Sequence, residues 1–102
     1  MLILIQGWSD TPKGVEVRPA GFNEVNIIYN GLLAQSGADQ VYLHCGFGDP
    51  QNWQNVSTIK MERTPRGWES TLRMQNSLMS FCFKDSANNW DNNNGYNWTV
   101  RA

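Results

Sequence analysis

The sequence is poor in the groups that carry out chemical reactions. Its 102 residues include one histidine, His44, two cysteines and a charged fraction of only 17%. A nucleophile–histidine pair needs both side chains on one face, and on a strand Cys45 points away from its neighbour His44. One histidine and two scattered cysteines do not supply a zinc site, and the sequence lacks a glycine-rich phosphate loop and an opposed pair of carboxylates. A small hydrolase is therefore the weakest functional hypothesis, and we expect no cofactor.

Basic charge is scarce as well. The formal net charge is −1 and the pI is about 5.7, so the basic footprint of a nucleic-acid-binding protein is missing. The same near-neutrality argues against binding to an anionic membrane surface, and no apolar run approaches the length of a membrane span. Amides and aromatic residues stand out instead, and a surface built from them suits a neutral polar ligand.

Two cysteines are too few for a disulfide scaffold. Cys45 falls among the inward positions of its expected strand and Cys82 among the outward positions, so we expect two separate thiols, with a disulfide as the minority alternative. The stretch 91–95 is similar to a calcium loop. Its glycine is fifth rather than sixth and no glutamate follows it, so a structural turn is the default interpretation.

The first seven residues are mostly apolar. They lack the basic region and the cleavage site of a signal peptide, so we predict a strand that pairs with another segment. Two settings stay open, a protein that remains in the cell and a fragment of a longer secreted chain.

Apolar residues mostly recur with a period of two, which predicts strands. The turn signals between these runs fit an all-β sandwich of about seven short strands in a single domain. The segment 30–36 allows at most one or two helical turns. The expected turns lie at 37–39, 46–50, 64–67, 76–77 and 85–97.

The five tryptophans divide into two groups. Trp68 and Trp98 are in phase with inward apolar residues, which predicts core positions, and packing is favoured for Trp8. Trp53 and Trp90 stand in amide-rich loops without apolar neighbours in phase, so they suggest an exposed aromatic surface. The alternative for both is that they cap the end of the sandwich.

Tyr42 and His44 project from the polar face of one expected strand. A sugar ring has an apolar face that stacks on an indole, and its hydroxyls need paired donors and acceptors such as amides and histidine. A lone strand histidine is more often structural, so the hypothesis that His44 binds a sugar depends on its being near Trp53 and Trp90.

Five segments together resemble the starch-binding modules of carbohydrate-binding module families 25 and 53, over about Val25 to Val100. The most specific segment runs from Asn89 to Trp98. The others are Val41–Gly48, Asn52–Trp53, Met61–Thr64 with Gly67–Trp68, and Phe81–Asp85.

This resemblance implies an immunoglobulin-like β-sandwich that binds α-1,4-linked glucans, such as starch, glycogen and maltooligosaccharides, without catalysis. It implies a binding face made of His44, Trp53 and Trp90. Tyr42 belongs to the same predicted site, and Asp91 and Asn92 would contact or support the sugar. The usual setting implied is an appendage of an amylase or a glucan synthase.

Residues 1–20 fall outside the family pattern and form an extension or an extra strand before a module at 21–102. The alternative to sugar binding is a structural or protein-interaction sandwich, such as a homodimer, that pairs through this N-terminal edge.

Overall fold

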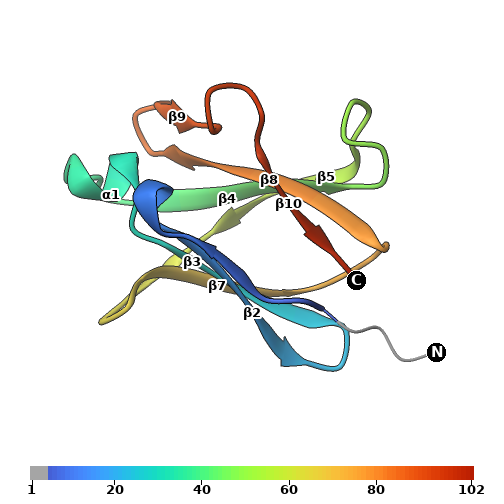
Figure 1. The fold of residues 1–102 in the computed structure, drawn as a ribbon. Helices are drawn as coiled ribbons and strands as arrows, with labels where there is room; N and C mark the ends of the chain where they lie inside the picture. The colour runs from blue at the N-terminus through green and yellow to red at the C-terminus, as the bar shows by residue number, and fades with distance from the viewer. Residues whose placement is uncertain (1–4) are drawn as a thin grey trace.

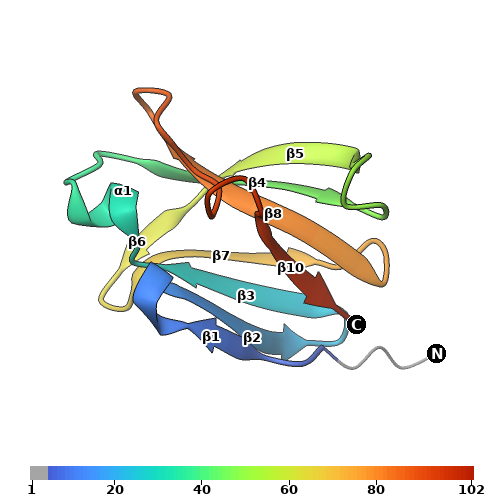
Figure 2. The same cartoon turned by 45° about the horizontal axis from the view of Figure 1, so that its top comes forward.

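The computed structural model describes residues 5–102. Two antiparallel sheets lie face to face with the core between them (Figures 1 and 2), which confirms the predicted all-β sandwich. The first sheet has the order β1-β2-β3-β7-β6 and contains β1 (Trp8–Asp10), β2 (Val15–Gly21), β3 (Glu24–Tyr29), β6 (Glu62–Thr64) and β7 (Gly67–Arg73). The second has the order β10-β8-β4-β5, with β9 paired to β8, and contains β4 (Val41–Phe47), β5 (Gln54–Lys60), β8 (Leu78–Asp85), β9 (Trp90–Asp91) and β10 (Trp98–Arg101).

Inward-facing and outward-facing residues alternate along the strands, and the inward-facing ones form the core. In β4, the inward side chains from Val41 to Phe47 are buried, while Tyr42 and His44 face outward and are half-buried. Aromatic rings fill the centre, where Tyr29 stacks on Phe83 with centroids 4.0 Å apart. Close packing of such large apolar side chains is the main favourable term in folding.

The predicted placement of three tryptophans is confirmed. Trp68 and Trp98 are 6% and 5% exposed and belong to the core cluster. Trp8 is half-buried against that core and stacks on Phe81 with a centroid distance of 6.3 Å.

Helix is confined to short segments. The 3-10 turn η1 (Thr11–Lys13) and the single-turn α1 (Leu32–Gln35) connect strands, and α1 lies inside the segment predicted to allow at most two turns. No helix among residues 5–102 is long and apolar enough to cross a membrane.

Two local predictions are wrong, and a third is tested only in part. The estimate of about seven strands is too low, because ten form within residues 5–102 and β1, β6 and β9 have only two or three residues each. Gly46 lies inside β4 rather than in a turn, so the chain leaves the sheet only at Gly48. Met1–Leu4 of the predicted first strand lie outside the described residues, and positions 5–7 are not strand.

Both cysteines are free and buried, as expected for separate thiols. Cys45 belongs to the core cluster, whereas Cys82 occupies an outward position opposite His44. Burial raises the pKa of each thiol to about 11, so both stay protonated at neutral pH.

Candidate functional site

Strand register brings several of the predicted site residues onto the outer face of the second sheet. Tyr42 of β4 lies opposite Lys84 of β8, which in turn lies opposite Trp90 of β9. Directly opposed residues of antiparallel strands project to the same face, so these three side chains form one row. His44 lies in the next row, between Cys82 on β8 and Thr58 on β5.

Trp53 reaches the same face from the loop between β4 and β5. A Cβ atom built on Gly46 would come within 2.6 Å of Trp53 Cβ and 3.1 Å of Trp53 Cγ, so the indole lies directly against this glycine. A hydrogen bond from Trp53 Nε1 to the Pro50 carbonyl, 2.7 Å long, orients the ring. Any larger residue at position 46 would occupy the place of the indole.

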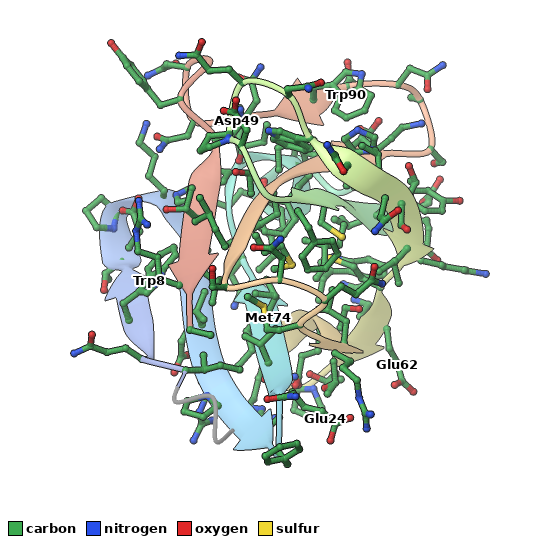
Figure 3. The ribbon with its side chains drawn as sticks, turned by 90° about the vertical axis from the view of Figure 1, so that its right-hand side faces the viewer. Trp8, Glu24, Asp49, Glu62, Met74 and Trp90 are labelled. Atoms are coloured by element: carbon green, nitrogen blue, oxygen red, sulfur yellow. The ribbon has the colours of Figure 1, made fainter. Side chains whose placement is uncertain are left out.

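His44 therefore lies between two indoles. Its ring centroid is 5.9 Å from that of Trp53 and 5.2 Å from that of Trp90, the second contact being edge-to-face. Trp90 keeps 47% of its surface exposed, unlike the core residue Trp68, and Trp53 is half-buried. We call Tyr42, His44, Trp53 and Trp90 the aromatic platform; Figure 3 shows Trp90 at one end of the molecule.

The environment of His44 favours its neutral form. Burial and, secondarily, the Lys84 cation lower the pKa of the imidazole below 6.5. Nδ1 lies 2.9 Å from the Thr58 hydroxyl, so Nε2 is the ring nitrogen without a hydrogen-bond partner among residues 5–102. A neutral imidazole with one nitrogen engaged can offer the other to a hydroxyl group.

The structure places Asp91 away from the platform. Asp91 lies opposite the inward residue Phe83, and its Oδ2 accepts a 2.6 Å hydrogen bond from the Tyr29 hydroxyl. The same hydroxyl accepts from the Leu33 amide at 3.0 Å. Burial and the bond to Asp91 raise the pKa of Tyr29, so it stays protonated. Asp91 thus anchors β9 to the core while its neighbour Trp90 faces outward.

Asn92 is also engaged within the protein. Its side-chain oxygen accepts from the Gly95 amide at 3.0 Å, and its carbonyl accepts from the Asn97 amide at 2.8 Å. Asparagine tolerates the left-handed backbone region that such turns require. The residues of the amide stretch with positive φ are Asn88, Asn93, Asn94, Gly95 and Asn97.

The structure therefore brings together Tyr42, His44, Trp53 and Trp90, and uses Asp91 and Asn92 to build the loop that presents Trp90. No group of three or more His, Cys, Asp or Glu side chains that could hold a metal ion occurs within the described part of the chain.

Sequence reasoning missed three contributors to this site, namely Gly46, Thr58 and Lys84. Gly46 continues the outward series of Tyr42 and His44, and a glycine inside a strand often marks close approach of another group. Lys84 lies two residues after the outward Cys82, so alternation places it on the same face, but the sequence alone does not indicate its role. Nothing in the sequence pairs Thr58 with His44, because that contact depends on register between strands.

Tyr29→Phe tests the anchoring of β9. We expect this change to lower the free energy of unfolding by about 1–3 kcal/mol, because the Leu33 amide and the Asp91 carboxylate both lose their partner. Urea unfolding measures the effect. Tyr42→Phe is the matched control and should change stability by less than about 0.5 kcal/mol. Equal stability of the two variants would contradict the anchoring role.

Comparison with known proteins adds evidence independent of this geometry. The family described as starch/carbohydrate-binding module (family 53) matches residues 25–81. An α-amylase of Clostridium acetobutylicum is 37% identical over 83 residues, which cover 78% of this chain and 10% of the amylase. The chain thus spans about a tenth of the length of this curated relative. No solved structure matches. The family match includes Tyr42, His44 and Trp53 and ends before Trp90.

Proposed function

Because the chain belongs to family 53 of the starch/carbohydrate-binding modules, we propose that it binds α-1,4-linked glucans on the aromatic platform and leaves them chemically unchanged. Family 53 is a family of non-catalytic binding modules. The observation that carries the proposal is the position of His44 between Trp53 and Trp90 on one outward face. Starch, glycogen and maltooligosaccharides are the ligands in this class.

The two indoles supply most of the binding energy. The C–H face of a glucosyl unit stacks on an indole, and each stacked ring removes roughly 100 Å² from water, worth about 2–3 kcal/mol before ordering costs. His44 Nε2 hydrogen-bonds a sugar hydroxyl. Two such contacts, less the cost of ordering the ligand, correspond to a dissociation constant roughly between micromolar and millimolar.

The module holds its ligand near an enzyme that acts on glucans. Support comes from the relative, an α-amylase much longer than this chain. Tethering a weak binding module to an enzyme raises the effective affinity without adding new contacts. Asp91 and Asn92 support binding through the loop that presents Trp90, which is one of the two roles that the resemblance implies.

Homodimer formation and pairing with another protein through the N-terminal edge stay predictions, since Met1–Leu4 lie outside the described residues.

Tryptophan fluorescence tests the proposal directly. Titration with maltoheptaose should quench or shift the emission, because Trp90 is exposed and Trp53 half-exposed, and both lie where the sugar stacks. The change should saturate at roughly micromolar to millimolar ligand. An unchanged spectrum up to solubility-limited maltoheptaose would contradict the proposal.

The lowered pKa of His44 sets the expected pH dependence of binding. Because the pKa of His44 is lowered, the imidazole is neutral at pH 8 and protonates in more acidic solution than an ordinary histidine does, so affinity for maltoheptaose should be constant from pH 8 to neutral pH. In more acidic solution protonation removes the Nε2 acceptor and affinity should fall. Calorimetric titrations between pH 8 and 4.5 measure the profile, and His44→Gln should flatten it. Tighter binding in acid would contradict the assigned role.

A further inference from the structure

The ammonium group of Lys84 lies within the aromatic platform. Lys84 Nζ is 5.7 Å from the ring centroid of Tyr42 and 5.5 Å from that of Trp90, so it stands between the two rings. It donates one hydrogen bond, 2.9 Å long, to Asn88 Oδ1. An ammonium group has three donors, and two of them have no hydrogen-bond partner among residues 5–102.

No carboxylate in the described chain forms an ion pair with Lys84. The ion pairs among residues 5–102 are Arg18–Glu16 and Arg66–Glu69, which lie in or next to strands of the first sheet. Asp85, the next residue after Lys84, accepts hydrogen bonds from the amides of Ala87 and Asn89. The side-chain amide of Asn89 also donates to the Asp85 carboxylate, and this bond contributes most to lowering the pKa of Asp85. Neutral groups therefore stabilise the charge of Asp85.

The charged side chains on the outward positions of the second sheet's strands are all basic. Strand register places Lys60, Lys84 and Arg101 at outward positions. The acidic residues of the same strands are Asp85 and Asp91, and both lie opposite inward residues. Basic residues are therefore the only charged ones that the strands of this sheet present outward, although the chain as a whole has a net charge of −1 and the loop that carries Trp53 contains the exposed carboxylate of Asp49.

The acidic residues of the strands gather on the other sheet. Those in strands of the first sheet are Asp10, Glu16, Glu24, Glu62 and Glu69. Figure 3 shows Glu24 and Glu62 at the end of the molecule opposite to Trp90. An anionic ligand that approaches the platform thus meets cations first, and this separation of charge favours its association.

A glucan hydroxyl can accept a hydrogen bond from the Lys84 ammonium, but it carries no charge to pair with it. A phosphate monoester carries about −1.5 to −2 charges at pH 7 and offers three strong acceptor oxygens. A contact between ammonium and phosphate therefore adds attraction between opposite charges to the hydrogen bond. We propose that the platform binds α-glucans bearing phosphate monoesters more tightly than unmodified glucans, with the Lys84 ammonium as the group that contacts the phosphate. This inference rests on the proposed function, because the sugar must stack for the phosphate to reach Lys84.

Paired calorimetric titrations test this inference. The ligands are maltoheptaose and maltoheptaose that carries one 6-phosphate group. At low ionic strength we expect the phosphorylated ligand to bind roughly fivefold to tenfold more tightly. The advantage should shrink at about 0.5 M salt, because screening weakens exposed charge–charge attraction. Equal dissociation constants for the two ligands would overturn the inference.

Substitutions at Lys84 test whether this residue causes the preference for the phosphorylated ligand. Lys84→Gln should bring the ratio of the two dissociation constants close to one, and Lys84→Arg should preserve the preference. Arg73→Gln is the matched control, since it removes one positive charge from β7 of the other sheet, and it should leave the ratio unchanged. A preference that survives Lys84→Gln would overturn the assignment.

Competition with inorganic phosphate shows whether the ligand is a phosphate ester on a glucan or free phosphate. At millimolar concentration it should compete poorly with phosphorylated maltoheptaose, because it lacks the sugar that stacks on the indoles. Efficient competition would make free phosphate the ligand and overturn the inference. Absence of binding with both oligosaccharides would instead overturn the proposed function, and the inference with it.

Discussion

Replacing Trp90 by alanine is expected to weaken maltoheptaose binding at least tenfold. The indole is 47% exposed on the outer face of the second sheet, so it is available to a sugar ring. Losing one stacking contact removes about 2–3 kcal/mol of burial energy, and about 1.4 kcal/mol corresponds to a factor of ten. Trp53→Ala should have a similar effect, because its ring lies on the other side of His44. Calorimetric titration of each variant provides the dissociation constants.

The fold should survive these changes. Tyr96→Ala is the matched control, since Tyr96 is 84% exposed in the same amide-rich stretch and its ring stacks on no other aromatic ring among residues 5–102. Its affinity for maltoheptaose should stay close to that of the unmodified protein. Unfolding of Trp53→Ala and Trp90→Ala would instead support the view that these tryptophans cap the sandwich.

Replacing the core residue Trp68 by alanine is expected to reduce stability strongly. Trp68→Ala should lower the free energy of unfolding by about 3–5 kcal/mol, because it leaves a cavity in the core in addition to the lost burial. Trp68 is only 6% exposed, lies opposite Tyr29 in register and carries the Arg63 guanidinium 5.6 Å above its ring. Urea unfolding measures the change. Domains of this size have about 5–15 kcal/mol of stability, so the variant would be close to its unfolding threshold.

An exposed aromatic residue provides the comparison. Phe22 is 60% exposed, and Phe22→Ala should change the free energy of unfolding by less than about 0.5 kcal/mol. Similar losses for Phe22→Ala and Trp68→Ala would contradict the division between core and surface aromatics. Any loss of glucan affinity in Trp68→Ala should disappear once the unfolded fraction is taken into account.

The period-two pattern predicted the sandwich because each strand buries one face. It placed Cys45, Trp68 and Trp98 at inward positions, and the structure has all three buried. The shortest strands could not be found in this way. β9, for example, has two residues, Trp90 and Asp91, which is too few to show an alternation.

The site was predictable where a residue type conflicted with its surroundings. Trp53 and Trp90 stood out because large indoles occurred among amides, and the structure places both rings beside His44. The part played by Asp91 could not be foreseen, because its partner Tyr29 is 62 residues away in the sequence. The role of the asparagines in the stretch 85–97 was also not predictable. Four of them adopt left-handed backbone conformations, so they shape the loop as much as they offer hydrogen bonds.

The central claim is that the aromatic platform selects the curved α-linked glucan chain. Calorimetric titration with maltoheptaose, with cellohexaose as the control of opposite linkage, tests this most directly. We expect saturable heat with maltoheptaose, with a dissociation constant roughly between micromolar and millimolar, and none with cellohexaose. Absence of heat with maltoheptaose, or equal binding of the two oligosaccharides, would contradict it.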